Sequence, residues 1–116
     1  MPFRACDSSL PLTPISFEIL LALTDGDRHG YAILQAVEAR LGSRLPLRTG
    51  TMYRALARLL DEGLIDEVPG AADADDRRRT YRITAEGRRV ARADAERLAD
   101  QVAAARAHRL LPTSKK

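Results

Sequence analysis

With 116 residues, 45% of them hydrophobic but only 4% aromatic and none tryptophan, the chain suits one globular domain with an aliphatic core. Its net charge of +3 permits a polyanionic partner without requiring one. The single cysteine, Cys6, excludes an intramolecular disulfide, and the two histidines, His29 and His108, are too far apart in sequence to indicate a metal site. The apolar runs are too short to span a bilayer. We therefore expect a cytoplasmic protein without metal, cofactor or membrane partner.

The first predicted helix follows residues 1–12, which mix small, polar and proline residues and are interpreted as a flexible arm. Thr13 and Pro14 predict its start, because a hydroxyl accepts an orphan N–H and proline suits the first helical position. The helix ends at Asp25-Gly26. Its apolar residues are Ile15, Ile19, Leu20 and Leu23.

A second helix is predicted to begin near His29-Gly30 and to end at Gly42, since glycine suits the left-handed exit position. With no partner residue nearby for catalysis or metal binding, His29 is interpreted as a capping or packing residue. The apolar stripe expected for this helix is Tyr31, Leu34, Val37 and Leu41.

The third predicted helix lies within residues 48–63 and has two different faces. One face is an apolar stripe at helical spacing, formed by Met52, Leu56, Leu59 and Leu60. The other carries Thr51, Arg54 and Arg58, with Tyr53 beside them. Such a helix suits a DNA major groove, although arginines on an exposed face are also ordinary for a solvated surface.

The periodicity changes after Gly63, where residues 64–68 and 80–84 are rich in β-branched side chains and roughly alternate. They predict two strands joined by a charged hairpin tip at 69–79. Thr84 is then predicted to cap a long helix over 85–111, followed by a disordered tail at 112–116.

Three helices followed by a two-stranded hairpin predict a mainly α fold with a small β-hairpin, the winged helix-turn-helix, over residues 13–84. In this layout the third helix enters the major groove of DNA and the hairpin loop lies along the backbone. The helix at 85–111 is interpreted as a separate dimerisation element.

Several segments, in this order and spacing, resemble the PadR family of bacterial transcriptional regulators over roughly residues 15–90. They are ILLAL at 19–23, DGDRHGYAI at 25–33, GTMYRAL at 50–56, EGLI at 62–65, RRRTYRIT at 77–84, and Gly87. The resemblance implies a dimeric DNA-binding repressor whose final helix serves dimerisation. That helix is short here, which is similar to the small subfamily with one C-terminal helix.

The predicted recognition surface begins at the entrance of the third helix, where unpaired backbone N–H groups and the helix dipole suit a phosphate oxygen. Thr49 as a simple cap and Gly50 as a simple turn residue are the alternative there. Arg54 is expected to reach a guanine edge or a phosphate, and Arg58 the backbone. The family resemblance adds a phosphate or base contact for Tyr53, whose alternative is a partly buried ring. The full set is Arg48, Thr49, Gly50, Thr51, Tyr53, Arg54 and Arg58.

The hairpin tip supplies a second predicted DNA contact through three adjacent arginines, Arg77, Arg78 and Arg79. Their attraction to phosphate would be independent of base sequence and would weaken with salt. The alternative is local pairing with the acidic residues just before them, Asp73, Asp75 and Asp76.

The final helix carries a narrow seam of the coiled-coil type that predicts a homodimer interface: Ala91, Ala95, Leu98, Val102 and Ala105. Charged residues, among them Asp94 and Arg97, are placed on its solvent faces. Packing of this helix on its own domain is the alternative. Two recognition helices in a dimer would lie about 34 Å apart and read a pseudo-palindromic site.

The sequence carries no nucleophile with a nearby base and no phosphate-binding glycine loop, so no enzyme is predicted. The leading hypothesis is a sequence-specific regulator of transcription that binds double-stranded DNA as a homodimer, and the family resemblance implies that it is a repressor. One alternative is a winged helix that docks a protein. Another is a regulator that senses a small hydrophobic effector at the dimer interface, where Phe3, Phe17 and the aliphatic C-terminal seam would form a generic hydrophobic pocket.

Overall fold

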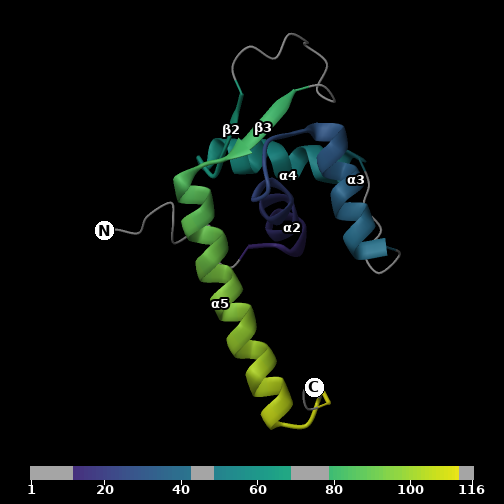
Figure 1. The fold of residues 1–116 in the computed structure, drawn as a ribbon, viewed down its shortest axis with the longest axis vertical. Coiled ribbons are helices and arrows are strands. Elements are labelled where there is room, and N and C mark those ends of the chain that lie inside the picture. The colour runs from purple at the N-terminus through teal and green to yellow at the C-terminus, as the bar shows by residue number, and fades with distance from the viewer. Residues whose placement is uncertain (1–11, 43–48, 69–78, 113–116) are drawn as a thin grey trace.

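The computed structural model describes residues 12–42, 49–68 and 79–112. Within them the chain forms four helices and a small sheet, shown in Figure 1. In chain order these are α2 (Pro14–Leu23), β1 (Arg28–His29), α3 (Gly30–Leu41), α4 (Thr49–Asp61), β2 (Ile65–Glu67), β3 (Thr80–Ile83) and α5 (Ala85–Ala107). The predicted arm up to residue 11, the hairpin tip at 69–78 and the last four residues lie outside the described residues.

The core is aliphatic, as the composition predicts, and α2 lies at its centre between the other helices (Figure 1). Thr13 caps α2 as predicted, because its hydroxyl accepts a hydrogen bond from the Ser16 N–H at 3.1 Å. Leu12 is buried in the same core, so the placement of residue 12 in a flexible arm was wrong. The buried apolar residues of the three packed helices are Ile19, Leu20, Leu23, Ile33, Val37, Met52, Leu56 and Leu59.

Helix α3 begins and ends where predicted, but its buried face is rotated from the predicted one. Tyr31 is 51% exposed, whereas Ile33, which was not in the predicted stripe, is fully buried with Val37. Each residue turns a helix by about 100°, so Tyr31 points away from the side that Ile33 and Val37 share. His29 precedes α3 without a side-chain capping bond, and its Nδ1 lies 3.0 Å from the Thr80 hydroxyl oxygen.

An ion pair fixes α2 against α3. Glu18 is buried on α2, and its carboxylate accepts hydrogen bonds of 2.7 and 3.1 Å from the Arg40 guanidinium. The hydrogen bond and the nearby negative charge raise the pKa of Arg40 above its ordinary value. A buried carboxylate is thereby balanced where the two helices meet.

The sheet has three antiparallel strands in the order β1-β3-β2, so the prediction of a two-stranded hairpin missed β1. Ile65 stands opposite Ile83, and Arg28 stands opposite Tyr81. Tyr81 and Ile83 are buried on one face while Arg82 is exposed on the other, which confirms the predicted alternation of β3.

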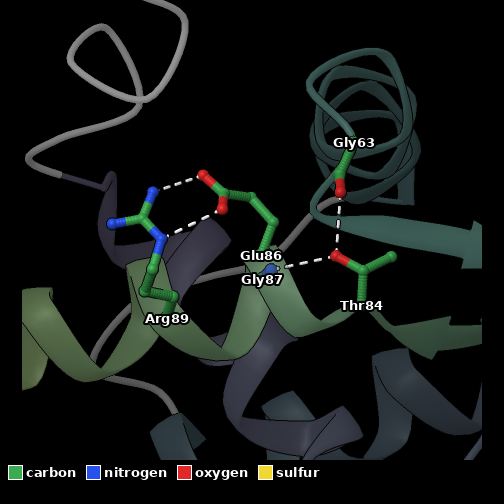
Figure 2. A network of polar contacts seen from close by, with 5 residues as sticks. All are labelled: Gly63, Thr84, Glu86, Gly87 and Arg89. Carbon is green, nitrogen blue, oxygen red and sulfur yellow. Dashed lines mark hydrogen bonds and ion pairs between the residues drawn. The ribbon is translucent and has the colours of Figure 1, made fainter.

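Helix α5 starts on a tightly packed cap (Figure 2). The Thr84 hydroxyl accepts from the Gly87 N–H at 2.9 Å and donates to the Gly63 carbonyl at 2.8 Å, which confirms the predicted cap and ties α5 to the end of α4. The helix ends at Ala107, four residues before the predicted end, because Arg109 adopts a left-handed φ of 65°. No helix in the described part of the chain is both long and apolar enough to cross a membrane.

Candidate nucleic-acid interface

Packing of α4 fixes which of its faces is free. Met52, Leu56 and Leu59 are at most 1% exposed, and Leu60 is partly buried against the same core, which confirms the predicted apolar stripe. These residues lie against α2, α3 and β2. Because these residues share one face of the helix, burying that face leaves the residues on the opposite face pointing outward.

The outward face of α4 carries the predicted DNA-binding side chains Arg54 and Arg58, both exposed, and Thr51, which is half-buried. Gly50 is exposed in the first turn, and a Cβ added there would lie 3.7 Å from Arg54 Nη1. The Arg54 guanidinium therefore lies back over the start of the helix, as long helical side chains do. The side chain adds a full positive charge where the helix dipole is positive and backbone N–H groups lack helical partners.

The predicted entrance of α4 is described only in part. The backbone of Thr49 begins the helix, which places it one residue before Gly50. Arg48 lies outside the described residues.

Arg58 and Tyr53 flank this surface. Arg58 Nε lies 3.3 Å from Glu62 Oε2, one turn along, and the arginine side chain is still 62% exposed. Exposed pairs of this kind contribute little free energy, so Arg58 can exchange Glu62 for a phosphate. Tyr53 is half-buried and packs against the core, an environment that resembles the partly buried ring held as the alternative.

The wing is described at its base. Arg77 and Arg78, together with Asp73, Asp75 and Asp76, lie outside the described residues. Arg79 Nε lies 3.3 Å from Glu67 Oε2 at the end of β2, with both side chains about 40% exposed (39% and 42%). One acidic partner of this arginine therefore lies on the neighbouring strand β2.

Strand β1 is the part of this region that sequence reasoning missed. Its two residues give no alternating pattern, and two residues are too few to distinguish a strand from a loop. The Gly30 N–H donates to the Arg79 carbonyl at 3.1 Å, and Arg28 Nε donates to the Ala22 carbonyl at 2.8 Å. These bonds join the base of the wing to the start of α3 and the end of α2.

The predicted seam of α5 is only partly free. Ala91 packs against the core, Leu98 and Ala105 are half-buried, and Ala95 and Val102 are exposed. The placement of Asp94 on a solvent face was wrong. It is 1% exposed because Leu12 and α2 lie beside this part of α5, and its Oδ1 accepts from Arg97 Nε at 2.9 Å.

The described residues contain no group of histidine, cysteine, aspartate or glutamate that could hold a metal ion. Phe17, one of the two aromatic residues considered for an effector pocket, lines an open groove between α2 and α5. Phe3 lies outside the described residues.

Three packed helices, a short sheet across their end and an exposed basic face on the third helix define a winged helix-turn-helix protein. The model of the PadR-like family of transcriptional regulators matches residues 19–93. The chain belongs to this family.

Relatives agree with this assignment. A PadR family transcription regulator from Clostridium difficile has 26% identity and a TM-score of 0.68, and the match covers 83% of this chain and 98% of that one. A transcriptional regulator from Clostridium thermocellum has 31% identity and a TM-score of 0.62, over 76% of this chain and 84% of that one.

A 37.1 kDa protein in the transposon TN4556 of Streptomyces fradiae is 37% identical over 81 residues, which is 70% of this chain. The match spans only 22% of the length of that relative.

Proposed function

We propose that this protein is a homodimeric repressor that binds a pseudo-palindromic operator, with α4 in the major groove of each half-site. The observation that carries the proposal is the placement of Arg54 over Gly50 on the outward face of α4. The opposite face of the helix is packed against the core. A rigid helix with a cationic first turn is suited to a polyanionic duplex.

Each side chain has a proposed part in binding. Arg54 reaches a guanine edge or a nearby phosphate, while Thr51 and the backbone at Thr49 and Gly50 meet phosphate oxygens. Arg58 and the wing arginine Arg79 exchange their acidic neighbours for phosphates. Because its hydroxyl oxygen is buried, Tyr53 contacts the DNA only with the exposed edge of its ring.

Dimerisation supports repression because two linked winged helices cover a longer stretch of promoter DNA than one does. The support for a dimer is α5, whose distal half extends beyond the other described elements (Figure 1). Val102 on that half is 40% exposed. An exposed apolar helix face of this kind is expected to be covered by a second copy.

A binding titration with duplex DNA from upstream of the protein's own gene tests the proposal. Arg54→Ala is expected to weaken specific binding by about tenfold or more, because a bidentate guanine contact is worth about 1–3 kcal/mol. Arg89→Ala is the matched control, since it removes the same charge from α5, where Arg89 pairs with Glu86. Equal binding by all three proteins would contradict the proposal, and retention of a protein partner in place of DNA would favour a docking role.

A further inference from the structure

The side chain of Arg28 lies on the inner face of the sheet. Residues that stand directly opposite each other on antiparallel strands carry their side chains on the same face. Arg28 stands opposite Tyr81, which is 3% exposed, and is itself half-buried. The exposed His29 stands opposite Thr80, and these two side chains meet on the other face. The Arg28 guanidinium is therefore directed toward the helices and away from the outer surface of the sheet.

That guanidinium binds the C-terminal end of α2, where Arg28 Nε donates to the Ala22 carbonyl at 2.8 Å. Carbonyls in the last turn of a helix lack helical partners and carry the negative end of the helix dipole. The last turn of α2, residues 20–23, contains only leucine and alanine, so the cations that meet these carbonyls come from other elements. A second cation comes from α5, because Arg88 Nη2 donates to the Thr24 carbonyl at 3.3 Å. Arginines from β1 and from α5 thus hold the same helix end.

Strand β1 in turn supports the wing strand β3, which is the central strand of the sheet. The Gly30 N–H donates to the Arg79 carbonyl at 3.1 Å, so this support extends to the residue directly before β3. A strand as short as β1 is only weakly held by its own pairing. The bond from Arg28 to α2 therefore anchors β1, and through it the base of the wing, on the helical core.

We propose that Arg28 is a positioning residue for DNA binding, which holds β1 on α2 so that the wing arginines keep a fixed position relative to α4. The inference rests on the proposed function, in which arginines of the wing meet phosphates. Because α2 also packs against α4, one helix relates the wing to the recognition helix. Arg28 itself is not expected to contact DNA, since its guanidinium is directed to α2. Its effect on DNA affinity therefore passes through the wing.

Amide hydrogen exchange of the full chain, followed by NMR without DNA, tests the anchor itself. In Arg28→Ala the Gly30 N–H should exchange about tenfold or more faster, because local opening of β1 then costs less free energy. The Leu59 N–H in α4 reports on the helical core and should change much less. Arg88→Ala is the matched control, since it removes the same charge and a bond to the same helix end, but from α5. Equal acceleration of the Gly30 and Leu59 amides in Arg28→Ala would indicate a general loss of stability and overturn the inference.

A double-mutant cycle tests whether the anchor acts through the wing. Affinity for duplex DNA from upstream of the protein's own gene is measured for Arg28→Ala in two backgrounds, the unmodified chain and a wing variant in which Arg77, Arg78 and Arg79 are replaced by alanine. Arg28→Ala should weaken binding by about fivefold or more in the unmodified chain and by no more than about twofold in the wing variant, because the effects of residues that act as a unit do not add. Arg28→Gln, which removes less of the side chain, replaces Arg28→Ala in both experiments if the alanine variant does not fold.

The outcomes of the cycle separate this inference from the proposed function. No loss of affinity, or a loss of the same size in both backgrounds, would show that Arg28 does not act through the wing, and would leave the proposed function standing. The same background-dependent loss in Arg88→Ala would also overturn the inference, because the end of α2 and not β1 would then be responsible. A wing variant that binds DNA as tightly as the unmodified chain would overturn the inference together with the proposed wing contact.

Discussion

Gly87, in the first turn of α5, packs closely against the base of the wing. A Cβ added there would lie 2.1 Å from the Leu64 carbonyl oxygen and 2.8 Å from Ile83 Cγ1. The first of these neighbours is backbone, which cannot rotate away as a side chain can. Thr84 binds both Gly87 and Gly63 at the same junction (Figure 2), so the angle between α5 and the winged helix depends on a few atoms.

Gly87→Ala is therefore expected to lower the free energy of unfolding by about 1–3 kcal/mol, because the added methyl group forces backbone to shift. Urea denaturation followed by circular dichroism measures this. Gly50→Ala is the matched control. It adds the same group where only the Arg54 side chain lies near, at 3.7 Å, and should leave stability unchanged or raise it by up to about 1 kcal/mol. Equal stability of the two variants would refute the packing argument.

Glu86 gives a pH-dependent prediction beside the same cap. Its hydrogen bond from Arg89 lowers the pKa of the carboxyl below the ordinary glutamate value. A carboxyl whose pKa is lowered in the folded state stabilises the fold at pH values above its ordinary pKa, and this stabilisation is lost as the pH falls through the lowered pKa. NMR titration should show Glu86 titrating below an ordinary glutamate, and Arg89→Gln should return it upward. An ordinary value in the unmodified protein would contradict the contact.

At the scale of elements, the amphipathic pattern of α4 was predictable because its stripe is complete and its opposite face is polar. The buried face of α3 was not, since Tyr31 and Ile33 are both apolar and only the packing of α2 decides between them. Strand β1 was hidden for another reason. It exists only through pairing with β3, a contact made about fifty residues along the chain.

The burial of Asp94 in α5 could not be predicted from the sequence either. A charged residue among charged residues predicts a solvent face, yet Leu12 and α2 lie beside this part of the helix. Arg97, one turn along, pairs with Oδ1 of the buried carboxylate, while Oδ2 is buried without a hydrogen-bond partner among the described residues. The positions proposed to bind DNA on α4 were foreseeable from its pattern and the family resemblance, while the residues of the α2–α5 groove depend on tertiary packing.

The exposed first turn of α4 leads to a prediction that separates binding from folding. Gly50→Ala adds a methyl group where a phosphate is proposed to approach the backbone. The variant should fold normally but bind operator DNA about tenfold or more weakly, which fluorescence anisotropy measures. Full binding by a stable Gly50→Ala protein would remove Gly50 from the proposed phosphate contact.

At the scale of the whole molecule, the proposed account joins a cationic helix to a long helix that pairs two copies. Attraction to phosphates depends on counterion release, so DNA affinity should fall steeply as salt rises. Removing a phosphate-contacting arginine such as Arg58 should reduce the slope of log affinity against log salt by about one. Arg89→Ala should leave that slope unchanged. A slope that is the same in the Arg58→Ala protein would place Arg58 outside the contact surface.

Selection of bound duplexes from a random DNA library by the full chain tests the central claim most directly. Two α4 helices related by a two-fold axis should enrich an inverted repeat, with half-site centres separated by about 10 base pairs or a multiple of that spacing. The Arg54→Ala protein should lose preference at positions within each half-site. Enrichment of a single unpaired motif would contradict the dimer, and no enrichment at all would contradict sequence-specific DNA binding.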